Sequence, residues 1–117
     1  MRFAQVLFVS LVFGSLAAGL ASAHSPLRET VPGDQAVLAT APAAIEMVFD
    51  DGIRLTRVEL AHPDHGEIEL DLSGSDGFAT DYSLPMSDLG RGTYRVTWRG
   101  LADDGHAMRG AFSFTVE

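Results

Sequence analysis

The chain has 117 residues, of which 46% are hydrophobic, and it contains no cysteine. Acidic residues outnumber basic ones by 16 to 8, so the formal net charge is −8 at pH 7. The lack of cysteine excludes disulfide bonds, cysteine nucleophiles and thiolate metal sites. The negative charge disfavours nucleic acid and anionic membrane surfaces as partners, whereas it is compatible with cations.

The first 23 residues have the layout of a secretory signal peptide. Arg2 supplies the positive end, an apolar run covers 6–20, and Ala21-Ser22-Ala23 forms an A-x-A cleavage site. The apolar run is shorter than the roughly 20 residues that a membrane span needs. We therefore expect cleavage, export, and no membrane insertion of the mature chain. The mature chain is then one domain, residues 24–117, which starts with His24 and carries a formal charge of −9 once Arg2 is removed.

Apolar and polar residues alternate in short segments after this point, which is typical of half-buried β-strands. The segments expected to form strands are 27–31, 44–49, 57–60, 67–72, 81–84, 94–99 and 112–117. Turn-forming residues occupy 62–66, so a hairpin is expected there.

One polar face per strand favours antiparallel sheets that are wet on one side. Two such sheets can bury their apolar faces against each other, so we predict an all-β, immunoglobulin-like β-sandwich of about seven strands. Trp98 is expected between the sheets. The other aromatic residues expected there are Phe49, Tyr94, Phe112 and Phe114.

The candidate ligands are the histidines and the acidic residues close to them. A free N-terminal His24 offers a metal its α-amine, with a pKa of about 8, together with its imidazole Nδ1. Asp104 and His106 lie in a D-x-H turn between the two most aromatic predicted strands, and that spacing lets both side chains point the same way. A tetragonal set of nitrogen and oxygen ligands suits Cu(II), so these residues are candidates for a Cu(II) site.

Plainer interpretations exist for each of these residues. A histidine after a signal peptide is often accidental, and a D-G-H sequence is often only a turn. His62 and His65 flank a proline, so we expect a solvated turn there instead of a second metal site. The methionines are too scattered to form a Met-rich Cu(I) site.

The sequence resembles the CopC family of periplasmic copper-binding proteins over essentially the whole mature chain. The resemblance rests on a histidine directly after the signal peptide, on "ETVPGDQAVLATAPAAIEMVF" and on "GTYRVTWRGLADDGHAMRGAFSFTV". It implies a seven-stranded Greek-key sandwich with one Cu(II), held by the amine and imidazole of His24, the carboxylate of Asp104 and the imidazole of His106. Asp51 matches an acidic residue that lies near the metal in some members, and Asp103 is an alternative carboxylate.

The resemblance also implies a role in copper resistance or homeostasis, in the periplasm, without catalysis. A monomeric carrier or buffer would sequester Cu(II) or deliver it to an inner-membrane copper transporter of CopD type. One alternative is a histidine-brace copper oxidase or monooxygenase. Another is a metal-free immunoglobulin-like interaction module, in which His24 and His106 have no role.

Overall fold

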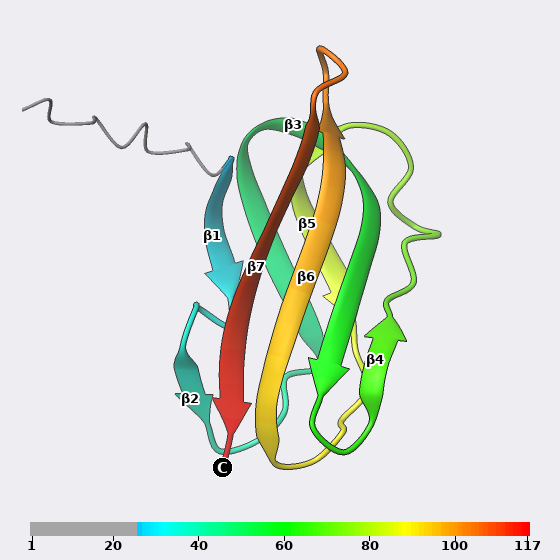
Figure 1. The fold of residues 1–117 in the computed structure, drawn as a ribbon. Helices are drawn as coiled ribbons and strands as arrows, with labels where there is room; N and C mark the ends of the chain where they lie inside the picture. Colours follow the sequence, from blue (N-terminus) through cyan, green and yellow to red (C-terminus); the bar gives the residue numbers. More distant parts are fainter. Residues whose placement is uncertain (1–25) are drawn as a thin grey trace, which may run out of the picture.

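The computed structural model describes residues 26–117, and within this range the chain forms only strands, turns and irregular segments (Figure 1). The predicted signal peptide and His24 lie outside the described residues. The strands are β1 (Leu27–Val31), β2 (Ala36–Leu38), β3 (Ala44–His62), β4 (Gly66–Glu69), β5 (Ala79–Pro85), β6 (Gly92–Ala102) and β7 (Ala107–Val116). Residues 26–117 contain no helix of the length and apolarity that a membrane crossing requires.

Strand β3 joins the two layers of the sandwich. Its first half pairs with β1 and β5, and its second half pairs with β4 and β6. Between these halves the register against β5 shifts from Val48 to Ile53, where the strand bends through Asp50, Asp51 and Gly52. The hydrogen-bonded path runs β1-β3-β6-β7-β2, with β2 parallel to β7 at one edge. The fold is the seven-stranded Greek-key immunoglobulin-like β-sandwich that we expected.

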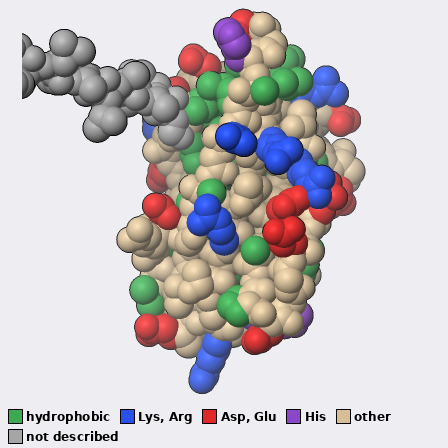
Figure 2. Space-filling view, viewed as in Figure 1, with side chains coloured by type: hydrophobic (Ala, Val, Ile, Leu, Met, Phe, Trp, Pro, Cys, Tyr) green, Lys and Arg blue, Asp and Glu red, His purple; other side chains and the backbone are tan. Residues whose placement is uncertain are grey.

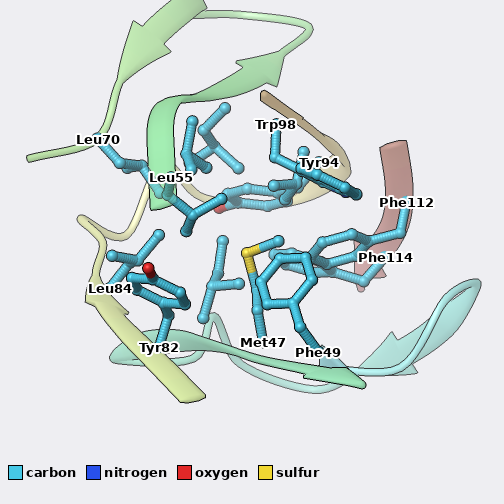
Figure 3. Close-up of a cluster of buried hydrophobic side chains, with 14 of the residues drawn as sticks. Met47, Phe49, Leu55, Leu70, Tyr82, Leu84, Tyr94, Trp98, Phe112 and Phe114 are labelled. Carbon is cyan, nitrogen blue, oxygen red and sulfur yellow. The ribbon is translucent and has the colours of Figure 1, made fainter. Parts of the chain in front are cut away.

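The core fills the space between these layers. Figure 3 shows Met47 and Phe49 of β3 facing aromatic side chains from the opposite layer. Trp98 is fully buried, and its ring packs edge-on against Phe49 with centroids 5.1 Å apart. Tyr94 stacks on Phe114 at 4.9 Å. The aromatic core predicted from alternation is therefore confirmed.

The strand count agrees with the prediction, but the strands themselves differ. Segments 44–49 and 57–60 are parts of the single 19-residue strand β3. The Asp-Asp-Gly sequence between them favours a turn, yet here it forms the bend that carries one strand from layer to layer. Strand β2 was not predicted, because three residues are too few to show a period, and the expected strand 67–72 ends at Glu69.

Candidate metal centre

The candidate centre lies at the tip of the β6–β7 hairpin, which projects beyond the rest of the sandwich (Figure 1). The turn is closed by two backbone hydrogen bonds, from Ala102 N to His106 O (2.9 Å) and from Gly105 N to Ala102 O (2.9 Å). Gly105 has φ +87°, a left-handed conformation that glycine adopts without a steric penalty. The turn therefore sets the backbone positions of the two predicted ligands that flank Gly105.

Asp104 and His106 are brought together, as their spacing predicts. The Nδ1 atom of His106 lies 2.6 Å from Oδ2 of Asp104, and the backbone N–H of His106 donates to Oδ1 at 3.0 Å. A carboxylate only accepts, so Nδ1 carries the hydrogen in this contact. Both side chains are open to solvent, with 82% of the His106 side chain and 57% of the Asp104 side chain exposed.

These contacts favour the charged form of the carboxyl. Hydrogen bonds from the backbone and then the side chain of His106 lower the pKa of Asp104 from its ordinary value of 3.8. Burial acts in the opposite direction, and the charge of His106 adds a smaller lowering effect. Asp104 is therefore an ionised oxygen donor at neutral pH, as a metal ligand must be.

The N-terminal end of the described chain lies at this same end of the sandwich. The backbone N–H of Asp50 donates to the Pro26 carbonyl at 2.8 Å, which places Pro26 beside the bend of β3. Just past that bend, Ile53 pairs with Ala102 at the base of the hairpin. His24 itself lies outside the described residues, two positions before Pro26.

The described residues include two of the predicted ligands and no complete site. Within residues 26–117, no three histidine, aspartate or glutamate side chains gather as a metal-binding group. Asp51 and Asp103 are exposed, and within that part of the chain neither makes a hydrogen bond or ion pair with His106. Asp104, rather than Asp103, is thus the carboxylate in contact with His106.

The spacing of the Asp104 and His106 atoms fits a Cu(II) ion. Two ligand atoms each about 2 Å from an ion, at right angles to each other, are about 2.8 Å apart. The 2.6 Å between Nδ1 and Oδ2 is close to that value, so both atoms can bind one ion after Nδ1 loses its proton and the two side chains reorient slightly. Each carboxylate oxygen has two lone pairs, and Oδ1 can therefore keep its bond to the His106 backbone.

His62 is at the other end of the molecule, and the prediction of a solvated turn is wrong for it. Its side chain is only 4% exposed, and its ring packs edge-on against Tyr94. Nε2 donates to the Arg91 carbonyl at 2.9 Å, while Nδ1 accepts from the Asp64 backbone N–H at 3.1 Å. The side chain thus joins the β3–β4 turn to the start of β6. His65 is exposed, as expected, with its Nδ1 3.2 Å from Nδ1 of His62.

The sequence held a signal for the burial of His62. Val58 and Leu60 point inward, and His62 continues that series at the same two-residue interval. The hairpin tip lies beyond the opposite end of the 11-residue strand β6, on the order of 30 Å away at about 3.4 Å per residue. His62 and His106 therefore cannot bind one ion together.

The comparisons with known proteins agree on the family to which the chain belongs. The family model described as the CopC domain matches residues 27–117. The copper resistance protein C of Pseudomonas syringae pv. tomato is 32% identical over 120 residues, which cover 94% of each chain. Among solved structures, CopC from Methylosinus trichosporium OB3b shares the fold with a TM-score of 0.67 at 23% identity, covering 80% of this chain and 94% of that one. PcoC, a copper resistance protein from Escherichia coli, gives a TM-score of 0.59 at 27% identity, covering 78% and 98%.

Proposed function

Because the chain belongs to the CopC domain family, we propose that it is a periplasmic copper(II)-binding protein for copper resistance or homeostasis. The proposed ligands are the α-amine and imidazole of His24, the carboxylate of Asp104 and the imidazole of His106. The chain would act as a carrier or buffer, which sequesters Cu(II) or delivers it to an inner-membrane transporter of CopD type. Its chemistry is coordination and release, without catalysis.

One observation carries this proposal: the contact between His106 Nδ1 and Asp104 Oδ2 at the end of the sandwich where the described chain begins. Two residues on one hydrogen-bonded turn supply neighbouring nitrogen and oxygen donors. An N-terminal histidine supplies two more nitrogens. Four donors of this kind complete a square plane, a geometry that suits Cu(II) and not Zn(II), which prefers a tetrahedron.

The chain's own residues perform three tasks in this mechanism. The turn holds the carboxylate and the imidazole side by side before the ion arrives, which reduces the entropy lost on binding. The lowered pKa of Asp104 keeps its carboxylate ionised. The exposure of both side chains leaves the ion accessible to an acceptor, so that copper can leave by ligand exchange.

The test is a Cu(II) titration followed by electron paramagnetic resonance on two purified chains. One is the mature chain, with His24 confirmed by mass spectrometry as its first residue. The other has one added glycine before His24, which converts the amine into an amide and moves the free amine by one residue. The proposal expects one-to-one binding with a nitrogen-rich tetragonal spectrum, weakened at least tenfold by the added glycine.

Three results would contradict different parts of the proposal. Equal binding by both chains would show that the amine of His24 is not a ligand. No specific binding by either chain would favour the metal-free interaction module. Oxygen consumption well above that of free copper would instead support the oxidase or monooxygenase alternative.

A further inference from the structure

Three arginines form a straight row across the solvent-facing side of β3, β6 and β7. The strand register places Arg57 opposite Arg99, and Arg99 opposite Arg109. All three side chains are exposed. We call these three residues the arginine row. Figure 2 shows arginine side chains crossing this face of the molecule below the hairpin tip, with acidic side chains beside them.

This arrangement is unfavourable for the fold. Like charges directly opposite each other on neighbouring strands destabilise a sheet, and the row contains two such pairs. Arg57 is ion-paired with Glu59, whereas within residues 26–117 neither Arg99 nor Arg109 forms an ion pair. The chain has twice as many acidic as basic residues, so the sequence contains enough carboxylates to pair with Arg99 and Arg109. Natural proteins break local rules of this kind mainly at functional or strained sites.

An apolar surface adjoins the row on the side of the hairpin tip. On the same face, the next three residues paired across the strands towards the tip are Arg54, Leu101 and Ala107. A shallow groove of about 400 Å³ lies here, lined by Thr56, Arg99, Gly100, Leu101, Ala107, Met108 and Arg109. A second groove of about 120 Å³ is lined by Arg57, Glu59, Thr97 and Arg99. Guanidinium groups beside apolar side chains are common at protein–protein interfaces.

The charges around the row favour a narrow acidic segment over a flat anionic surface. Glu59 pairs with Glu69, and Glu67 lies on the same face of β4, so an acidic group borders the row. A lipid bilayer that covered the row would also press against these carboxylates and be repelled. An extended peptide that follows the row would avoid them. Arginine binds carboxylates in a planar, two-point geometry, which suits such a segment.

We propose that the arginine row is a docking surface for a carboxylate-rich segment of the protein that receives copper from this chain. That the partner receives copper rests on the proposed function, whereas the binding of a carboxylate-rich segment to the arginine row does not. Arg109 is three residues beyond His106, about 10 Å along an extended strand. A partner held by the row therefore has its own ligands within reach of the hairpin tip.

The test uses the metal-free mature chain and a synthetic ten-residue peptide in which glutamate and serine alternate. Side-chain Nε–H resonances of the row are followed by NMR at low ionic strength as the peptide is added. The proposal expects saturable shifts that weaken with salt. It expects at least tenfold weaker binding for the double variant Arg99→Gln/Arg109→Gln. Arg95→Gln is the matched control, since Arg95 is exposed on the same face of β6 but pairs with Ala61 and Ser113; it should stay within twofold of the parent chain.

Further measurements separate this proposal from its alternatives. The double variant should melt at the same or a higher temperature than the parent, because like-charge pairs are removed; a lower melting temperature would indicate a structural role and overturn the proposal. Equal weakening by Arg95→Gln, or the absence of peptide binding, would also overturn it. Tighter binding of the row to phosphatidylglycerol vesicles would replace the peptide segment with a lipid surface. Cu(II) binding by the double variant should match the parent, so a failure of the copper proposal is detected independently.

Discussion

The Nδ1 atom of His106 lies 2.6 Å from Oδ2 of Asp104, and the same carboxylate accepts the backbone N–H of His106 at 3.0 Å. Two bonds to one residue orient the carboxylate without help from elsewhere in the fold. The D-x-H turn therefore orients both side chains through its own hydrogen bonds. Its neighbour Asp103 has no such contact with His106, which distinguishes the two aspartates.

Replacement of Asp104 by asparagine is expected to weaken Cu(II) binding by at least about tenfold, since the loss of even a residue that only hydrogen-bonds to a metal ligand typically costs this much. The amide carries no charge, and it cannot both accept the His106 protons and bind the ion as a carboxylate does. Isothermal titration calorimetry with Cu(II) measures the change. Asp103→Asn is the matched control and should leave the affinity unchanged; a larger loss for Asp103→Asn would show that the other carboxylate is the ligand.

The Asp104 carboxyl should titrate with a midpoint below 3.8, because hydrogen bonds from His106 lower its pKa. A folded-state pKa below the unfolded value stabilises the native state above about pH 4, and this contribution is lost as pH falls through the folded pKa. Carboxyl ¹³C NMR gives the midpoint directly. In His106→Ala it should rise towards 3.8.

Asp71 provides the internal reference for this titration. Its pKa is also lowered, but through the backbone and side chain of Ser73, with the Ser73 N–H 2.8 Å from its Oδ1. The His106→Ala substitution should therefore leave the midpoint of Asp71 in place. If both midpoints moved together, the effect would be a general change in charge and not the local contact.

Replacement of His62 by alanine should lower the free energy of unfolding by about 2–4 kcal/mol, because it leaves a cavity and removes the partners of the Arg91 carbonyl and the Asp64 N–H. Urea unfolding measures this change. His65→Ala, at an exposed position, should change stability by no more than about 0.5 kcal/mol. Neither variant should alter Cu(II) binding, and a loss of one bound copper in either would reveal a second site.

Gly110 is expected to tolerate no side chain. It pairs with Trp98 across β6 and β7, and a Cβ atom there would lie 2.7 Å from Trp98 Nε1. Gly110→Ala should therefore destabilise the fold by about 1–3 kcal/mol through displacement of the indole. Thermal unfolding followed by the fluorescence of Trp98, the single tryptophan, tests this. Gly74→Ala, where nothing lies within 4 Å of the added methyl, is the control and should behave like the parent chain.

Much of the fold could be predicted from the sequence because the alternation of apolar and polar residues along a strand is a local property. Residues two apart point to the same face of a strand, so Tyr94, Val96 and Trp98 could be placed in the core without knowing their neighbours. The contact between Asp104 and His106 could also be predicted, because it is local: one turn holds both residues together. The sequence by itself thus determined the all-β class, the aromatic core and the described half of the candidate site.

Other features were decided only by the tertiary structure, because they depend on which strands become neighbours. The continuity of β3 requires both layers to be present for its two halves to pair with. His62 is buried through Arg91, which is 29 residues away in the chain. The arginine row exists only because the register of β3, β6 and β7 aligns three residues from separate segments. Long-range pairing sets these relationships, and no local period in the sequence records them.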